Sequence, residues 1–251
     1  MMGGPTAVGL AMAQVSVAAQ QAAPLPAGGS TPLQVSGAVN VNTKGISLVP
    51  ALTLGKPSTI FDLVVRRSRV SFEPQFRFAT DGTPWSFLLW GRFRAVQGEK
   101  FRLTLGGHPS FSFRTSHVVI GGVARDLIET RRYVAGEVAP SYTLSRHIAA
   151  GAYYLYARGL DVGGPRHTHL LAARVPLSNL PLPGGLLIQA VPQFYYLRTN
   201  GEAGTYFSTT LSLGRPGFPL SLSAIVNQPA HTKVTGGRDF LWNVGVTYSA
   251  P

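Results

Sequence analysis

One stretch near the end of the chain reads Phe240-Leu241-Trp242-Asn243-Val244-Gly245-Val246-Thr247-Tyr248, with a bulky apolar residue at every second position. Successive side chains of a β-strand point to opposite faces, so this stretch predicts a strand with one apolar face and one polar or small face. Similar runs of roughly ten residues recur from Gly45 to Tyr248, with no helical stretch between them. Repetition of this alternation is typical of a transmembrane β-barrel.

Twelve such runs can be traced back from the end of the chain. They predict an all-β fold, a transmembrane antiparallel up-and-down β-barrel of about 12 strands. The runs are residues 45–54, 59–66, 70–79, 85–95, 101–114, 131–142, 147–158, 167–177, 186–197, 205–214, 219–228 and 239–250. We expect the short turns on the periplasmic side, at 97–100, 143–146 and 215–218, and the longer links on the extracellular side, at 115–130, 159–166, 198–204 and 229–238.

The composition agrees with a wall that faces lipid. Apolar residues make up 45% of the 251 residues and charged residues only 13%, about half the usual charged share of soluble domains. The chain has no Cys, which excludes disulfides and thiolate metal sites. The net charge of +12 comes mainly from arginines spread singly along the runs, a distribution that argues against nucleic acid as a partner.

The N-terminal part differs from the rest. Residues 1–30 carry no charged side chain, and the apolar run from Ala7 to Ala13 resembles the start of a signal peptide, so this segment is expected to be signal-like or disordered. Residues 31–44 are interpreted as a periplasmic N-terminal segment, although Leu33 to Asn42 also alternates. The barrel itself is expected at 45–251.

Four stretches carry a resemblance to a known group: Gly55–Phe61, Ser71–Ala79, Pro84–Phe87 and Tyr153–Asp161. They resemble an uncharacterised group of outer-membrane β-barrel proteins from the Bacteroidetes lineage, over most of residues 35–248. The resemblance implies a bacterial outer-membrane location, with outer-membrane lipid, lipopolysaccharide and the barrel-assembly machinery as partners, and it implies no activity. Such barrels usually finish on an aromatic residue, whereas here Tyr248 is followed by Ser249-Ala250-Pro251.

Aromatic residues gather near the ends of the runs. Amphipathic rings at both rims would form girdles at the level of the lipid headgroups. The alternative is that they are cross-strand pairs of a soluble sheet. The predicted girdle residues are Trp85, Tyr133, Tyr142, Tyr156, Tyr196, Trp242 and Tyr248.

The polar faces of the runs carry the predicted lumen. An arginine at the lipid midplane costs about 2–4 kcal/mol, so the arginines in the runs must point inward. Two hypotheses follow: the positive charge lines a wet path that favours anions, or arginine and glutamate form a network that fills a narrow barrel. The predicted lumen residues are Glu73, Gln75, Arg77, Arg92, Arg94, Arg102, Glu137, Arg174, Gln189 and Gln193.

No motif in the sequence points to catalysis. His167-Thr168-His169 has the spacing of a metal pair, but no third ligand has a matching position, so we interpret it as a rim pair and predict no metal or cofactor. We therefore expect a protein that is not an enzyme. Three functions remain open: a narrow porin-like channel for small, anionic solutes; a sealed structural or accessory barrel that pairs with another envelope protein; and a soluble ligand-binding barrel. The oligomeric state stays open.

Overall fold

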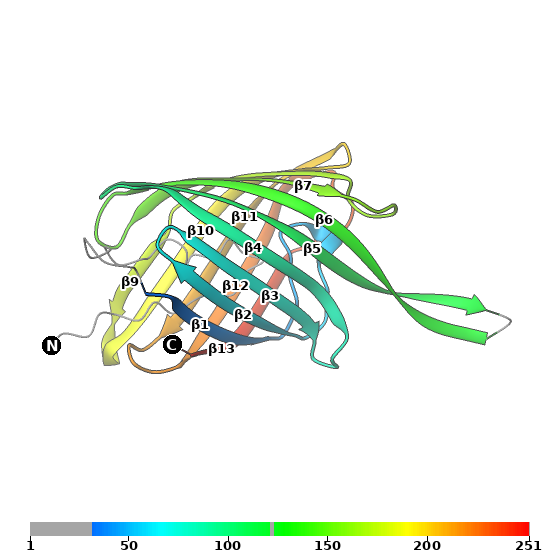
Figure 1. The fold of residues 1–251 in the computed structure, drawn as a ribbon, viewed down its shortest axis with the longest axis horizontal. Helices are drawn as coiled ribbons and strands as arrows, with labels where there is room; N and C mark the ends of the chain where they lie inside the picture. Colours follow the sequence, from blue (N-terminus) through cyan, green and yellow to red (C-terminus); the bar gives the residue numbers. More distant parts are fainter. Residues whose placement is uncertain (1–31, 121–122, 251) are drawn as a thin grey trace.

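The computed structural model describes residues 32–120 and 123–250, and this part of the chain forms strands with two single-turn 3-10 helices (Figure 1). The segment 1–30, expected to be signal-like, lies outside the described residues. The strands are β1 (Gln34–Asn42), β2 (Ser58–Arg67), β3 (Val70–Ala79), β4 (Pro84–Gln97), β5 (Phe101–Ile120), β6 (Val123–Thr143), β7 (Ala149–Gly159), β8 (His167–Arg174), β9 (Leu177–Leu182), β10 (Leu186–Thr199), β11 (Glu202–Gly214), β12 (Leu220–Thr232) and β13 (Leu241–Ala250). The 3-10 helices are η2 (Pro50–Leu52) and η3 (Pro183–Gly185).

The strands form one closed antiparallel barrel. Each strand pairs with its neighbours in the chain, except that β8 and β9 do not pair with each other, and β1 pairs with β13 to close the ring. Both β8 and β9 pair with β10. They act as one strand interrupted at Val175-Pro176, where proline has no N–H to donate to the ladder. The ring therefore has twelve positions, which confirms the predicted fold class.

The two ends of the barrel differ in their connections. β1 begins and β13 ends at one rim, where the connections are short; we call this rim the turn end. The opposite rim, the loop end, carries the connections 43–57, 160–166 and 233–240. One link expected to be long there is a two-residue turn, because Asn200 and Gly201 both have positive φ (49° and 90°), the geometry that closes a tight hairpin.

The first strand of the ring is not the predicted one. The run 45–54 is wrong as a strand, and the segment 31–44, expected outside the barrel, contains β1 at Gln34–Asn42. Its register is set by polar pairs with β13 on the inner face: Asn243 Nδ2 donates to Asn42 Oδ1 at 2.6 Å, and Asn40 donates to Thr247. The small residues of this run made it look too weak for a lipid-facing wall, yet β1 pairs along its whole length with β2.

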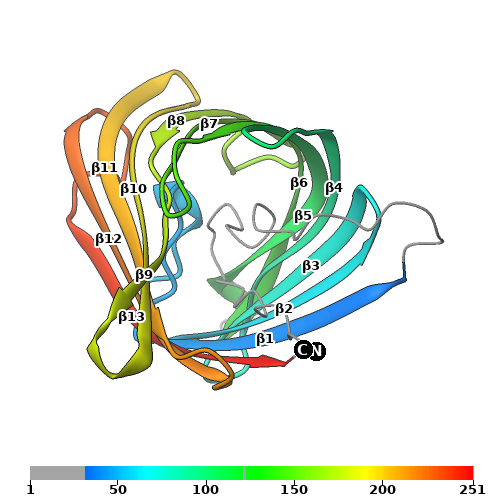
Figure 2. The same ribbon diagram turned by 90° about the vertical axis from the view of Figure 1, so that its left-hand side faces the viewer.

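The residues of the mispredicted run fold into the barrel instead. Ile46, Leu48, Val49 and Pro50 are all buried in succession, which a wall strand with one exposed face would not allow. Residues 43–57, which we call the plug, enter the ring at the loop end, as the view along the barrel shows (Figure 2).

The plug contacts two distant parts of the wall. Trp85 Nε1 of β4 donates to the Leu52 carbonyl at 2.9 Å, and the Tyr195 hydroxyl of β10 donates to the Leu48 carbonyl at 3.4 Å. Strands β4 and β10 are five places apart in the ring of twelve, so they form nearly opposite walls. Leu48 and Val49 also pack in one apolar cluster with Tyr195, Tyr206 and Val234, which together with other members of the cluster fills this part of the lumen.

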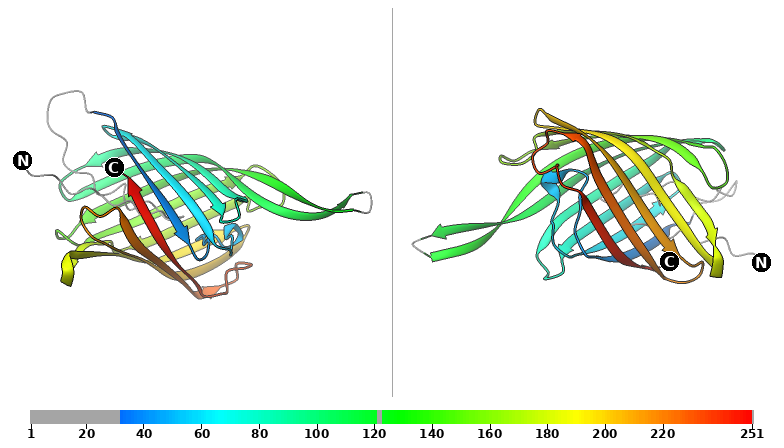
Figure 3. Two further views of the ribbon diagram at one scale, coloured as in Figure 1. Left: turned by 90° about the horizontal axis from the view of Figure 1, so that it is seen from below. Right: turned by 180° about the vertical axis from the view of Figure 1, so that it is seen from behind.

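A second difference concerns residues 115–130, expected as an extracellular link. They belong to β5 and β6, whose pairing continues without a break to Ile120 and Val123. Residues 123–130 are all exposed, because this part of the hairpin projects beyond the barrel wall (Figures 1 and 3). The alternation fades there because neither face of the projecting hairpin covers a core.

The wall is polar inside and apolar outside. Phe72 is 48% exposed, whereas its neighbour Glu73 is 5% exposed and Arg77 is 3% exposed. The opposite distribution is the rule in soluble proteins, where charged side chains are almost never fully buried. No helix within the described residues is long and apolar enough to span a membrane. The exposed apolar belt follows the outer face of the ring and requires a lipid environment.

Candidate functional site: the lumen

All ten residues predicted to line the lumen lie on the inner face of the wall. Arg102, Gln189 and Gln193 are half-buried, and the other seven are buried. Strand alternation accounts for this, because each of these residues lies an even number of positions from buried residues of the same strand, such as Ser71 on β3 and Tyr195 on β10. Their functional role stays a prediction.

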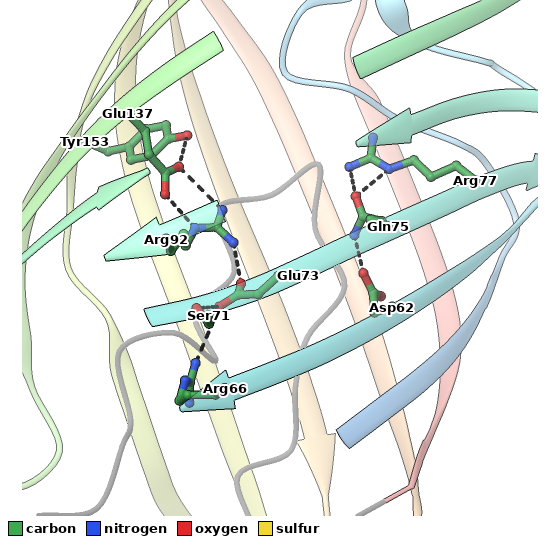
Figure 4. A network of polar contacts seen from close by, with 9 residues as sticks. All are labelled: Asp62, Arg66, Ser71, Glu73, Gln75, Arg77, Arg92, Glu137 and Tyr153. Atoms are coloured by element: carbon green, nitrogen blue, oxygen red, sulfur yellow. Dashed lines mark hydrogen bonds and ion pairs between the residues drawn. The ribbon is translucent and has the colours of Figure 1, made fainter. Parts of the chain in front are cut away.

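Arg92 is the centre of the largest polar network (Figure 4). Its Nε donates to Glu137 Oε1 at 2.6 Å, and its Nη1 forms an ion pair with Glu73. The Tyr153 hydroxyl donates to Glu137 Oε2 at 2.9 Å, and Ser71 Oγ donates to Glu73 Oε1 at 2.7 Å. The network therefore runs along one wall, from β3 through β4 and β6 to β7, rather than across the lumen.

Gly106 makes this network possible. Arg92, Gly106 and Glu137 occupy one row on the adjacent strands β4, β5 and β6. Because Gly106 has no side chain, Glu137 folds over it toward Arg92; a Cβ at Gly106 would lie 2.7 Å from Glu137 Oε1. The glycine is therefore the gap through which the ion pair forms.

A second network lies closer to the loop end of the same wall. Arg77 Nε donates to Gln75 Oε1 at 2.6 Å, and Gln75 in turn donates to Asp62 (Figure 4). The guanidinium of Arg77 also lies 5.2 Å from the ring centre of Trp85. Arg77 thus reaches a carboxylate only through an amide.

Arginines outnumber carboxylates in and beside the first network. Arg94 lies close enough to Arg66 and Arg102 for their positive charges to repel one another. The positive charges of Arg174 and Arg92 repel each other in the same way. Among the described residues, Glu73 forms ion pairs with Arg66 and Arg92, and Glu137 forms one with Arg92. Arg66, near the end of β2, approaches Glu73 to 3.5 Å.

Several of these arginines have unused donors. Arg66 Nε, Arg94 Nη2, and both Nε and Nη2 of Arg174 are buried without a hydrogen-bond partner among the described residues. A buried, unpaired cationic donor is costly unless a ligand or water satisfies it. The inner wall therefore presents donors for anions.

Two predicted girdle residues are wrong, because Trp85 and Tyr133 are buried inside the barrel. Trp85 is the extra residue of a β-bulge: Arg77 pairs with Ser86 and Phe78 with Pro84, so the phase of β4 reverses there. Tyr133 shares its phase with Glu137, and β6 continues past it to Val123, so it is not at a strand end.

The other girdle residues lie on the outer wall. Tyr142 and Tyr248 are exposed toward the turn end, and Tyr156, Tyr196 and Trp242 face outward toward the loop end. This is the placement that a girdle requires, and the girdle role itself stays a prediction.

The histidine pair sits on the outer wall next to two tyrosines. His167 Nδ1 lies 2.9 Å from the Tyr156 hydroxyl, and His169 Nδ1 lies 2.9 Å from the Tyr154 hydroxyl. Each ring is therefore engaged by a tyrosine of β7. Within the described residues, no three His, Cys, Asp or Glu side chains come together in a metal-binding group.

Comparison with known proteins gives fold likeness only. No protein-family model matches the sequence, and no curated protein matches it. Among solved structures, an outer-membrane channel of Pseudomonas putida F1 superposes with a TM-score of 0.51 at 12% identity, covering 90% of this chain and 99% of that one. LpxR from Salmonella typhimurium superposes with a TM-score of 0.50 at 11% identity, covering 85% and 99%.

The protein is a bacterial outer-membrane β-barrel. The closed twelve-position ring and its apolar outer belt carry this conclusion, and the shared fold agrees with it. The fold by itself does not decide whether this barrel is a channel or an enzyme, so the function has to be argued from the lumen.

Proposed function

We propose that this outer-membrane barrel is a narrow channel that prefers small anions. The observation that carries the proposal is the arginine excess on the inner wall, with unpaired buried donors on Arg66, Arg94 and Arg174. Rings of arginine select anions in pores because they offer positive charge and hydrogen bonds in place of the ion's hydration shell. We propose this function in preference to an enzymatic one.

The orientation follows the usual arrangement of such barrels. We propose that the turn end faces the periplasm and the loop end faces the exterior, since short turns are typically periplasmic. The plug then narrows the outer mouth. Outer-membrane lipid, lipopolysaccharide and the barrel-assembly machinery are proposed partners, and membership in the Bacteroidetes-type group stays a proposal.

One observation favours a second candidate, a sealed structural or accessory barrel that pairs with another envelope protein. The plug is hydrogen-bonded to nearly opposite walls and packs in an apolar cluster, so it occupies a large part of the lumen near the loop end. In a sealed barrel, the arginine network would serve only to hold the wall strands together.

Ion selectivity in planar bilayers tests the channel proposal. In a salt gradient, Arg94→Ala and Arg174→Ala should each shift the reversal potential toward lower anion preference, because each removes an inner-wall charge. Arg69→Ala is the matched control, since Arg69 lies in the exposed β2–β3 turn. Heat-dependent gel mobility establishes that each variant is folded. Unchanged selectivity in both folded lumen variants would contradict the proposal.

A further inference from the structure

A cavity of about 140 Å³ lies inside the barrel, between the plug and the inner wall of β4 to β8. The sequence does not reveal this cavity, because the alternation of residues 45–54 predicts a wall strand. The plug supplies Leu48 and Leu52 to the lining, and the wall supplies Leu88, Trp90, Tyr133 and Leu155. This part of the lining is apolar and aromatic.

The volume selects the size of the occupant. An apolar protein cavity of about 150 Å³ stays free of water and takes up one benzene molecule. The present cavity is of nearly that size, so its apolar part has room for a single six-membered aromatic ring.

The polar edge of the cavity selects the substituent. Arg77 lines the cavity, and Gln75 occupies its Nε and Nη2. Gln75 thus contacts two of the three guanidinium nitrogens of Arg77. His108, which is 8% exposed, also lines the cavity, and its Nδ1 is buried without a partner in the same part of the chain. A guanidinium nitrogen and an unsatisfied imidazole nitrogen therefore border the apolar space.

A buried guanidinium pairs most strongly with a carboxylate, because a charge-assisted hydrogen bond is about twice as strong as a neutral one. No acidic side chain lines the cavity. The cavity lining therefore supplies no carboxylate that could pair with Arg77.

We propose that this cavity binds one small aromatic carboxylate, with its ring among Leu48, Leu88 and Trp90 and its carboxylate on Arg77. The proposed carboxylate contact is Arg77 rather than Arg94 or Arg174, and occupancy of the cavity does not require that the barrel conducts ions. Ring and carboxylate are recognised by different residues, so they can be tested separately.

Calorimetric titration of the detergent-solubilised, full-length barrel with sodium benzoate is the test. Benzoate should bind with one site per barrel. Acetate, which has the carboxylate alone, and 2-naphthoate, which has a second ring, should both bind much more weakly. Benzoate heat that is matched by acetate would overturn the aromatic part of the proposal.

A matched pair of variants locates the site. Leu88→Trp places a large ring in the cavity and should abolish benzoate binding. Leu89→Trp adds the same bulk at the next residue, which faces outward, and should leave binding unchanged. Equal binding by the two variants would show that benzoate sits elsewhere or in the detergent, and would overturn the proposal.

Arg77→Gln tests the carboxylate contact. Loss of hydrogen bonds to a charged group should weaken benzoate roughly 10- to 100-fold, while benzyl alcohol, which keeps the ring without the charge, should bind this variant and the parent alike. Benzoate affinity that survives Arg77→Gln in a folded barrel would overturn the assignment of Arg77. Because no current is measured, failure here leaves the channel proposal standing.

Discussion

At the residue scale, Gly106 controls whether the central ion pair can form. A Cβ there would meet Glu137 Oε1 at 2.7 Å, so Gly106→Ala must push Glu137 away from Arg92. We expect a loss of about 1–3 kcal/mol in the free energy of unfolding, the usual cost of overpacking an interior. Urea unfolding in detergent, followed by tryptophan fluorescence, measures it.

Gly136→Ala is the matched control for this prediction. Gly136 lies on the outward face of the next strand, and its nearest neighbour to a new Cβ is a backbone oxygen at 3.8 Å, an ordinary contact. This variant should unfold at the same urea concentration as the parent. If both alanine variants were equally stable, the ion pair over Gly106 would contribute little to the fold.

Asp161 is a titrating residue of the β7–β8 connection, outside the barrel wall. Hydrogen bonds from the Arg132 guanidinium, the shortest from Nη2 to Oδ1 at 2.7 Å, and from the Arg132 backbone N–H to Oδ2 at 2.6 Å lower the pKa of Asp161 from 3.8 to about 2. The folded pKa lies below the unfolded one, so this contact stabilises the folded state above pH 3.8. That contribution is lost as the pH falls through about 2.

An NMR titration of the Asp161 carboxyl carbon checks this directly, with a midpoint expected near 2. Arg132→Gln should move the midpoint up toward 3.8, whereas Arg238→Gln, in the β12–β13 connection, should leave it in place. A parental midpoint near 3.8 would mean that the loop is not held by Arg132 in solution.

Single residues also mark where prediction from sequence stops. The inner phase of Glu73, Arg77 and Arg92 could be predicted, because alternation and the cost of arginine in lipid both require it. The inward position of Trp85 could not be predicted, because a bulge reverses the inward and outward alternation of β4 without any signal in the residues around it. The ion-pair partner of Arg92 could not be predicted either, because pairing across three strands depends on register and on the gap at Gly106.

At the element scale, the plug is the segment that decides between a gated and a sealed barrel. Replacing residues 46–53 with a short Gly-Ser linker removes the contacts to β4 and β10 but none of the strand pairing. If the plug narrows an open path, single-channel conductance should rise in this variant.

The projecting hairpin offers the matched control. Deleting residues 115–128 removes part of β5 and β6 that lies beyond the wall and should leave conductance unchanged. Absence of current both in the parent barrel and in the plug variant would favour the sealed barrel.

The plug also shows why one of the twelve predicted runs is not a strand. Eleven runs alternate because lipid lies on one side of them and the lumen on the other. Residues 45–54 carry apolar side chains at the positions where a lipid-facing strand would carry them, yet these side chains are buried inside the barrel. Sequence alone does not distinguish an apolar segment covered by protein from one covered by lipid.

At the scale of the whole molecule, the barrel holds more positive charge inside than it neutralises. The arginines around Glu73 and Glu137 exceed their partners, and the wall network leaves donors open toward the lumen. A network built only to fill the barrel would be expected to satisfy its own members. This imbalance is the basis of the proposed anion preference.

The most direct measurement is the reversal potential of single parental barrels in a planar bilayer across a potassium chloride gradient. The account predicts a current whose reversal potential lies on the chloride side of zero, and a larger conductance with the same sign after replacement of residues 46–53. A reversal potential at zero or on the potassium side, in either form of the barrel, would contradict it.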